Sequence, residues 1–302
     1  MTYKTHSVKT HGGLVILALA CTYLIWGSTY LAIRYAIESF PPFVMVGFRF
    51  TVAGSLLYVV LRLRGHPHPT WAQWGGAAWV GLLLPVLGNG TVSHAQLHVS
   101  SSVAALAIAT APLWMAVFSS WWGHRISRRE WLGIAIGLVG ILLLNTRGSL
   151  QGDAWNAALL MFAAASWSLG SVWGKHLAMP PGLMGAATQM LCGGLIAFGF
   201  AQVAGEGWPS EITPRAWGAI SFLIVLGSII AFSAYHWLLH QVRPMVASSN
   251  TFVNPVVAFV VGVWFAGEQI HLMEYVALAV ILAGVFLVLT ATPEAIADEP
   301  LA

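Results

Sequence analysis

Residues 244–267, with the sequence PMVASSNTFVNPVVAFVVGVWFAG, decide how this chain folds. The stretch is apolar enough to cross a lipid bilayer, yet it carries Asn250 and Asn254 shortly before Pro255. A polar side chain at that depth costs free energy unless it finds a partner. An earlier stretch, residues 99–123 (VSSSVAALAIATAPLWMAVFSSWWG), places Pro112 at nearly the same distance before its closing glycine. The chain therefore repeats itself, and the two copies differ in their polar residues.

The composition excludes a water-soluble fold. Hydrophobic residues make up 58% of the 302 residues and charged residues only 8%, whereas soluble domains carry about 25% charged residues. A helix needs about 20 residues to cross a hydrocarbon core of ~30 Å. We therefore expect an all-α membrane protein with the lipid bilayer as its surroundings. The net charge of +3, with scattered Lys and Arg, indicates no nucleic-acid partner.

Ten apolar runs separated by polar or proline-bearing breaks predict ten transmembrane helices. The first run follows Lys4 and Lys9 as a secretory leader would, but it continues to Ile33, so we expect it to stay as a helix. The runs cover residues 12–34, 42–62, 71–96, 99–121, 130–146, 155–177, 182–204, 214–240, 244–266 and 273–291.

The distribution of Lys and Arg predicts the orientation in a bacterial-type inner membrane. With the N-terminal tail (residues 1–11) in the cytoplasm, nine of these residues fall inside and three outside, as the positive-inside rule requires. Ten crossings then return the C-terminal tail (residues 292–302) to the cytoplasm. The inner residues are Lys4, Lys9, Arg62, Arg64, Arg125, Arg128, Arg129, Lys175 and Arg243, and the outer ones are Arg34, Arg147 and Arg215.

The second half of the chain copies the first, so residues 12–146 and 155–291 are predicted to be two five-helix repeats. Because five is odd, the second repeat enters the membrane inverted. Inverted repeats are typical of secondary transporters, whose substrate site lies near the midplane between the halves. We therefore expect a central cavity. The matched positions, 139 to 144 residues apart, are Trp26 with Trp167, Pro41-Pro42 with Pro180-Pro181, His94 with His236, Pro112 with Pro255, and Gly140 with Gly284.

Three segments resemble the two EamA-type repeats of the drug/metabolite transporter superfamily. They are WGSTYLAIRYAIESFPPFVMVGFRF (26–50), SSSVAALAIATAPLWMAVFSSWWGHRIS (100–127) and AYHWLLHQVRPMVASSNTFVNPVVAFVVGVWFAGEQI (234–270). Within that superfamily the chain looks most like the YddG-type bacterial exporters of aromatic and other neutral amino acids. The resemblance implies a ten-helix exporter. One departure is Gly123-His124 where the second repeat has Gly267-Glu268, since the family usually keeps an acidic residue in both.

Proline and asparagine side chains inside the runs are the first site candidates. Pro112 and Pro255 occur in both copies, and each removes a backbone hydrogen bond and kinks its helix. We predict that they act as hinges, with a kink needed only for packing as the alternative. Asn250 and Asn254 lie on one helix face, at positions that are alanine in the first copy. They are predicted to contact substrate, with helix-to-helix hydrogen bonds as the alternative.

Aromatic residues deep in the runs form a second group of candidates. Trp26 and Trp167 lie more than ten residues into their runs, which is too deep for an interfacial aromatic belt, and Tyr30, Trp173 and Trp114 join them as candidates. Rings in a membrane cavity would stack on a flat substrate and attract an ammonium group. We predict that they contact substrate, and packing in the core is the alternative.

The remaining candidates are polar. Asn89 and His94 in the third run and Tyr235 in the eighth are predicted substrate contacts, with hydrogen-bonded core residues as the alternative. Arg49 is the only cation buried within a run. We expect it to bond backbone carbonyls or outer headgroups, with substrate as the alternative.

The absent features also bear on function. No Asp or Glu lies in the middle of a run, so facilitated exchange and proton antiport both stay open. The motifs HExxH, GxSxG and GxGD and the phosphate-binding loop are absent, so we expect neither catalytic residues nor a metal or cofactor.

The function predicted from the sequence is export of small amphipathic metabolites, foremost aromatic and other neutral amino acids, by alternating access. The alternative cargo is cationic drugs or other metabolites. We expect a small-molecule substrate and a monomer. A homodimer formed through the runs 130–146 and 273–291, which are rich in small residues, is the alternative.

Overall fold

The computed structural model describes residues 12–123, 126–147, 153–242 and 250–290. These residues form helices and connections without a β-strand. Among them, seven helices are long and apolar enough to cross a membrane, and two shorter apolar helices cover Val253–Ala266 and Leu272–Val288. The all-helical prediction is confirmed. The count of ten crossings and the inverted arrangement stay predictions.

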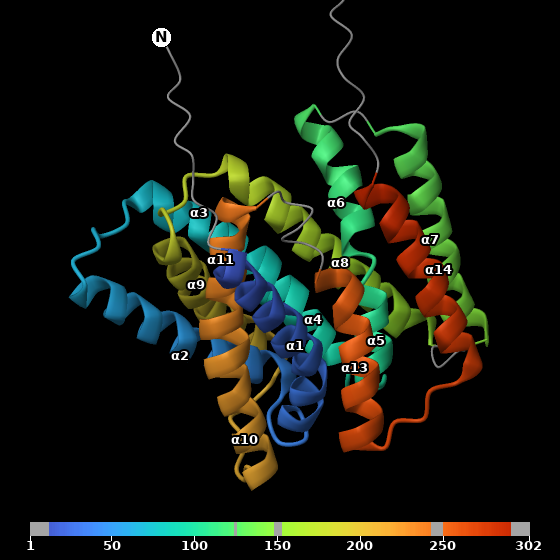
Figure 1. Ribbon diagram of the computed structural model, residues 1–302. Helices are drawn as coiled ribbons and strands as arrows, with labels where there is room; N and C mark the ends of the chain where they lie inside the picture. Colours follow the sequence, from blue (N-terminus) through green and yellow to red (C-terminus); the bar gives the residue numbers. More distant parts are fainter. Residues whose placement is uncertain (1–11, 124–125, 148–152, 243–249, 291–302) are drawn as a thin grey trace, which may run out of the picture.

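The described residues of the first half of the chain form nine helical elements (Figure 1). Pro42 and Pro112 stand within the first two positions of their helices, where the missing N–H is not needed. Thr70 and Gln73 form a reciprocal capping box. The elements are α1 (Gly12–Ala36), α2 (Pro42–Leu63), α3 (Trp71–Gly81), η1 (Leu82–Gly90), α4 (Thr91–Ala95), α5 (Ser101–Ile108), α6 (Ala111–Ser119), η2 (Ser120–Trp122) and α7 (Arg128–Arg147).

The second half repeats this order closely. Asp153 and Thr213 cap their helices by accepting hydrogen bonds from backbone N–H groups in the first turn. Residues 244–249 of the ninth predicted run lie outside the described residues. The elements are α8 (Ala154–Trp173), η3 (Gly174–His176), α9 (Leu183–Val203), α10 (Pro214–Phe222), η4 (Leu223–Ile230), α11 (Ala231–Gln241), α13 (Asn250–Ala266) and α14 (Leu272–Leu289).

Two π-helical segments interrupt otherwise α-helical spans. Segment η1 continues α3 into α4, and η4 continues α10 into α11. Their first residues, Leu82 and Leu223, are 141 residues apart, which is the spacing of the sequence repeat. Segments of this kind are rare and occur often at functional sites. Apolar periodicity had predicted plain helices here.

The two repeated prolines have different surroundings. At Pro112 the chain does not merely kink, because α5 ends at Ile108 and α6 begins at Ala111. The Ser168 hydroxyl of α8 lies 2.8 Å from the carbonyl oxygen of Ala111 at this break. Pro255, in contrast, lies inside an uninterrupted α13.

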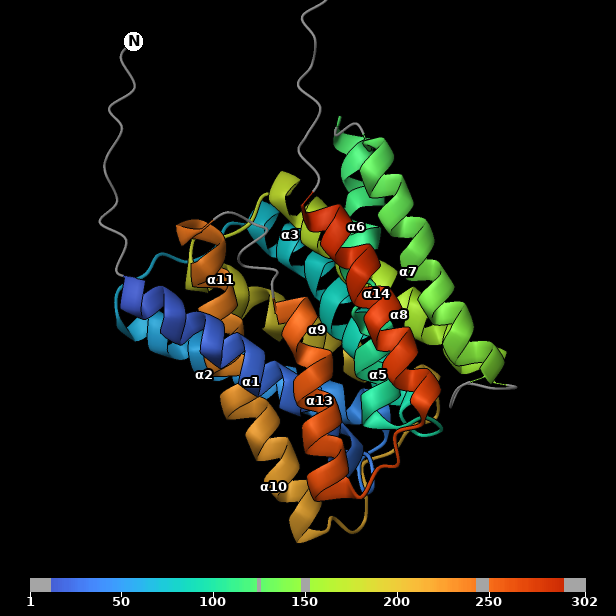
Figure 2. The same ribbon diagram turned by 45° about the vertical axis from the view of Figure 1, so that its right-hand side comes forward.

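Close backbone contacts join particular helix pairs. Helix α2 packs along α9, α7 along α14, and α1 against α13 and α11 (Figures 1 and 2). A Cβ at Gly54 of α2 would lie 2.5 Å from a backbone nitrogen of α9, and one at Gly284 of α14 would lie 2.6 Å from the carbonyl oxygen of Gly133 in α7. Small residues therefore permit these contacts, as helix packing in membranes requires.

The buried apolar residues form two main cores. The first core joins α1, α2 and η1 to α9, α10 and η4, and the second joins α5, α6 and α7 to α8, α13 and α14. Each core thus contains helices from both halves of the sequence. The two halves of the sequence are therefore packed into one another.

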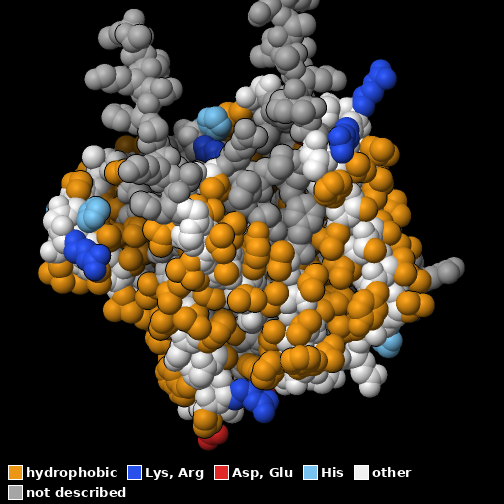
Figure 3. Space-filling view, viewed as in Figure 1, with side chains coloured by type: hydrophobic (Ala, Val, Ile, Leu, Met, Phe, Trp, Pro, Cys, Tyr) orange, Lys and Arg blue, Asp and Glu red, His pale blue; other side chains and the backbone are white. Residues whose placement is uncertain are grey.

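The outer surface is apolar around the middle of the molecule. Figure 3 shows hydrophobic side chains over most of the visible face, with charged side chains mainly at its margins. Val203, Trp264 and Leu272 are among the exposed large hydrophobic residues. An apolar exterior of this kind requires lipid rather than water as the surroundings.

Candidate functional site

A partly open cavity lies between the two cores. Its volume of about 100 Å³ is several times the ~10–15 Å³ that one buried water molecule needs. Helices α1, α2, α4, α5, α6, α8, α11 and α13 line it together with η1. Ile33 and Phe50 contribute from the first core, and Val92 and Ala163 from the second. Helices from both halves of the sequence therefore meet at this cavity.

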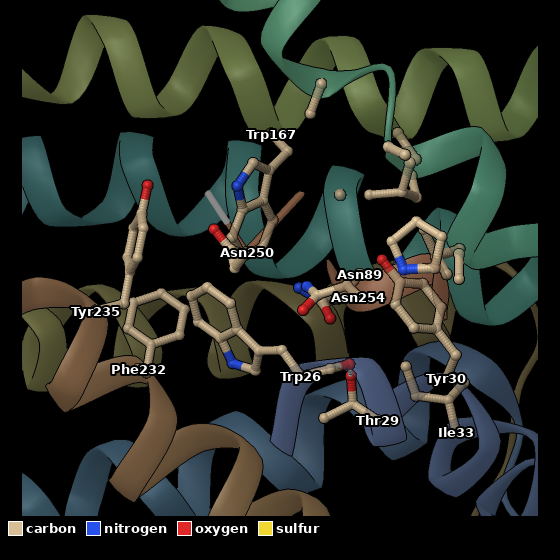
Figure 4. A pocket seen from close by; sticks show the side chains of 18 of the residues that line it. Trp26, Thr29, Tyr30, Ile33, Asn89, Trp167, Phe232, Tyr235, Asn250 and Asn254 are labelled. Atoms are coloured by element: carbon tan, nitrogen blue, oxygen red, sulfur yellow. Dashed lines mark hydrogen bonds between the residues drawn. The ribbon is translucent and has the colours of Figure 1, made fainter. Parts of the chain in front are cut away.

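Four rings, which we call the aromatic wall, cover one part of the cavity: Trp26, Trp167, Phe232 and Tyr235 (Figure 4). Trp26 is central, with its ring centroid 6.2 Å from that of Trp167, 6.0 Å from that of Phe232 and 5.0 Å from that of Tyr235. The first two pairs meet edge to face, which is a favourable arrangement of ring quadrupoles. The wall offers rigid apolar faces and the polar tip of Tyr235.

The fold fixes the central ring of this wall. The indole Nε1 of Trp26 donates a 3.1 Å hydrogen bond to the carbonyl oxygen of Gly227 in η4. A Cβ at Gly27 would lie 2.5 Å from Cβ of Val257, so this glycine lets α1 approach α13 closely. The approach brings Trp26 and Asn254 to the same cavity.

Three asparagine side chains line the same cavity. Asn250 and Asn254 are buried on α13, and Asn89 comes from η1. Figure 4 shows Asn89, Asn254 and Trp26 together in the middle of the view, with Tyr30 to one side. Each amide can both donate and accept hydrogen bonds. The cavity can therefore bind a polar group as well as a ring.

Arg49 also lines the cavity, which the sequence did not predict. Its side chain is buried, with 3% of its surface exposed, and Nε donates a 2.9 Å hydrogen bond to the hydroxyl of Ser228. The expectation that it bonds backbone carbonyls or outer headgroups is therefore wrong. Helix α2 turns the guanidinium inward because it packs on η4.

Two more lining residues were not predicted, although the sequence held a signal for them. Thr29 is three residues after Trp26, and Phe232 is three residues before Tyr235. Residues three apart share a helix face. The helix face that carries Trp26 therefore also carries Thr29, and the face that carries Tyr235 also carries Phe232.

Eight of the predicted residues line the cavity: Trp26, Tyr30, Asn89, Trp167, Tyr235, Asn250, Asn254 and Pro255. Four others do not. Trp114 stacks on Phe118, Trp173 meets Trp79 edge to face, and His94 is half-buried at the end of α4. Pro112 lies just behind the lining residue Ala111. Met115, the next residue of α6 after Trp114, lines the cavity.

A second polar cluster, the Glu268 clamp, joins three helix ends. Glu268, in the connection between α13 and α14, accepts hydrogen bonds from the backbone nitrogen and the hydroxyl of both Ser101 and Ser102 at the start of α5. Nη1 of Arg34, near the end of α1, lies 2.9 Å from the same carboxylate. The clamp satisfies N–H groups that the first turn of a helix leaves unpaired.

The charge of the clamp follows from its contacts. Burial raises the pKa of Glu268, but the hydrogen bonds from Ser101 and Ser102 outweigh this effect, so the pKa lies below its ordinary value. The carboxylate is therefore ionised at neutral pH. Among the described residues, no group of three or more His, Cys, Asp or Glu side chains could hold a metal ion.

Membrane-length helices around an aromatic and polar cavity define a polytopic membrane protein with an internal cavity. A model of the EamA-like transporter family matches residues 13–146 and again residues 154–290. The chain belongs to the EamA-like transporter family, within the drug/metabolite transporter superfamily, and is a membrane transporter. The likeness to YddG-type exporters stays a prediction.

Related proteins cover nearly the whole chain. The uncharacterized inner membrane transporter YedA of Escherichia coli K12 is 43% identical over 272 residues, which are 90% of this chain and 89% of YedA. An uncharacterized transporter of Synechocystis is 25% identical and covers 90% of this chain and 88% of its own length. A crystal structure of a protein with 20% identity superposes with a TM-score of 0.65 over 91% of this chain and 96% of that one. The last match concerns the fold alone.

Proposed function

We propose that this protein is a secondary transporter that exports small amphipathic metabolites, with aromatic and other neutral amino acids as its substrate class. The observation that carries this proposal is the cavity, which the aromatic wall and three asparagine side chains line together. A ring of the substrate would lie on the wall by stacking, and its polar end would bond the amides. An ammonium group would also be attracted by the ring faces.

The topology that we propose has ten crossings in two inverted repeats. The seven long apolar helices, the two shorter ones and α7 supply these crossings. The paired π-helical segments η1 and η4, 141 residues apart, add support for a repeat. Both termini face the cytoplasm, and the excess of Lys and Arg in the inner loops supports this orientation. The inner membrane location agrees with the name of YedA.

Alternating access would then take place between the two cores, since the cavity is lined by both. Pro255 lines the cavity inside a continuous helix, whereas the chain is broken before Pro112. We propose bending at these two places as the motion that opens the cavity to each side in turn. The protein acts as a monomer in this scheme, because one chain supplies the whole cavity.

The test is transport by purified protein in liposomes. Radiolabelled L-phenylalanine inside preloaded vesicles should exchange with external unlabelled phenylalanine, tryptophan or leucine, and the rate should saturate. The variant Trp167→Ala should change the order of preference among these amino acids, whereas Trp155→Ala, at an exposed helix end, should not. Absence of flux of every neutral amino acid in both directions would refute the substrate assignment.

Cationic drugs, the alternative cargo, fit the cavity less well. Aromatic rings attract cations, but the guanidinium of Arg49 lines the same space, and like charges in a low-dielectric site repel each other. No Asp or Glu is among the residues that line the cavity in the described part of the chain. A dication or a strongly basic drug would therefore meet an unfavourable potential.

A further inference from the structure

Arg49 is a buried cation for which the described residues provide no anion. Arginine stays protonated in proteins, so the side chain carries a full charge. Its contacts within the described chain are one hydrogen bond, from Nε to the Ser228 hydroxyl, and a guanidinium carbon 4.5 Å from the centroid of the Phe50 ring. Neither contact supplies a negative charge.

The Nη1 nitrogen of the guanidinium has no hydrogen-bond partner among the described residues. This nitrogen is buried. A buried charge is costly unless it is paired, and in membrane proteins such residues mark substrate pathways. Arg49 is also among the residues that line the cavity, so a molecule bound there lies next to this side chain.

Two residues of segment η4, Gly227 and Ser228, lie directly against the guanidinium of Arg49. A Cβ at Gly227 would lie 3.2 Å from Nη2 of Arg49 and 3.1 Å from Cγ2 of Thr29, so a larger residue would press on the guanidinium. The carbonyl oxygen of the same glycine accepts the hydrogen bond from Trp26, and the next residue, Ser228, holds Nε. One short segment therefore positions both the cation and the central ring of the aromatic wall.

We propose that the cavity binds its substrate through a carboxylate held by Arg49, while the apolar part of the substrate lies against the aromatic wall. A guanidinium donates two parallel hydrogen bonds to a carboxylate, and Nη1 is the free donor. Ser228 is a positioning residue, because it acts through the guanidinium. This inference rests on the proposed function and narrows it, since aromatic amines, amides and esters are then excluded as substrates.

The first experiment uses the unaltered protein, so it does not depend on a variant that folds. Uptake of labelled L-phenylalanine into liposomes is competed with L-phenylalanine, 3-phenylpropanoate, L-phenylalaninamide and 2-phenylethylamine. The two carboxylates should compete about 10- to 100-fold better than the amide and the amine, because a hydrogen bond to a charged group is lost in the latter. Equal competition by acid and amide would overturn the carboxylate assignment while leaving amino-acid transport intact.

A binding measurement keeps the two proposals separate. Thermal stabilisation of the detergent-purified protein is recorded with 3-phenylpropanoate and with its amide. If phenylalanine is not transported but the acid alone stabilises the protein, the amino-acid assignment fails and the carboxylate site stands. If neither compound stabilises the protein more than the other, the carboxylate site fails.

Variants then assign the effect to this residue. Arg49→Gln should remove the preference for acid over amide, and Ser228→Ala should raise the KM for phenylalanine with little change in kcat. Arg215→Gln is the matched control, because Arg215 is an exposed arginine that lies 3.6 Å from the carboxylate of Glu38. Arg215 is not among the residues that line the cavity. A preference for the acid that persists in folded Arg49→Gln protein would overturn the role of Arg49.

Discussion

Replacing Glu268 by glutamine should loosen the start of α5. The carboxylate accepts hydrogen bonds from Ser101 and Ser102, including a 2.9 Å bond from the Ser101 backbone nitrogen and a 2.6 Å bond from its hydroxyl, and it pairs with Arg34 at 2.9 Å. Its side chain is 5% exposed. Glutamine keeps one acceptor oxygen but carries no charge, and a hydrogen bond to a charged group contributes about 1.5–3 kcal/mol. Since several such bonds are weakened together, we expect a loss of about 3 kcal/mol.

Hydrogen exchange followed by mass spectrometry measures this loss where it occurs. A loss of about 3 kcal/mol corresponds to roughly 100-fold faster exchange of amides that open locally, since 1.4 kcal/mol is a factor of ten. Peptides that contain Ser101 and Ser102 should show this acceleration in Glu268→Gln protein. The midpoint of thermal unfolding should fall by about 5 °C, because an unfolding entropy of ~2.1 cal/mol/K per residue gives ~1.6 °C per kcal/mol for a chain of 302 residues.

The control for this experiment is Glu211→Gln. Glu211 is an exposed loop carboxylate, so the same chemical change should leave exchange in α5 unaltered. Arg34→Gln should have a smaller effect than Glu268→Gln, because the Arg34 side chain is 40% exposed and water can replace it. Unchanged exchange at the start of α5 in Glu268→Gln protein would refute the assignment of the clamp.

Three further predictions concern packing, motion and pH. Gly54→Ala should lower the free energy of unfolding by about 1–3 kcal/mol through overpacking of α2 on α9, whereas Gly199→Ala, with open space around it, should be neutral or slightly stabilising in thermal unfolding. Pro255→Ala should change the transport rate more than the substrate preference, and Asn254→Ala the reverse; the opposite pattern in liposome assays would count against these roles. The ionised form of Glu268 stabilises the folded protein at pH values above the ordinary pKa of the carboxyl group, and this stability is lost as the pH falls through the lowered pKa of the folded state. On acidification, the midpoint of thermal unfolding should therefore fall more in unaltered protein than in Glu268→Gln protein.

The sequence predicts the helices and several cavity residues because depth and helix face can be counted along an apolar run. Asn250 and Asn254, four residues apart, come together at the cavity, and so do Trp26 and Trp167 from matching positions of the two repeats. Polar or bulky side chains far from a helix end are accommodated mainly in the protein interior. This constraint is strong in a membrane protein.

The direction in which other side chains point depends on tertiary packing, which the local sequence pattern does not reveal. Helix α2 is apolar nearly all round, so its sequence does not say which side faces the bundle, and Arg49 could not be assigned to the cavity. On α6, Met115 lines the cavity and its neighbour Trp114 does not, which the apolar run does not indicate. The Glu268 clamp joins residues 167 apart, which is beyond any local pattern.

The two π-helical segments have a practical consequence for mutational work on this protein. On a helical wheel, each residue advances by about 100°, and every residue added by a π turn shifts the phase of all later positions by that amount. A cysteine scan along α3 and α4, or along α10 and α11, should therefore show labelling stripes that fall out of step after Leu82 and after Leu223. Wheels drawn for each half of these spans separately will give the accessible side correctly, whereas one wheel drawn through the whole span will not.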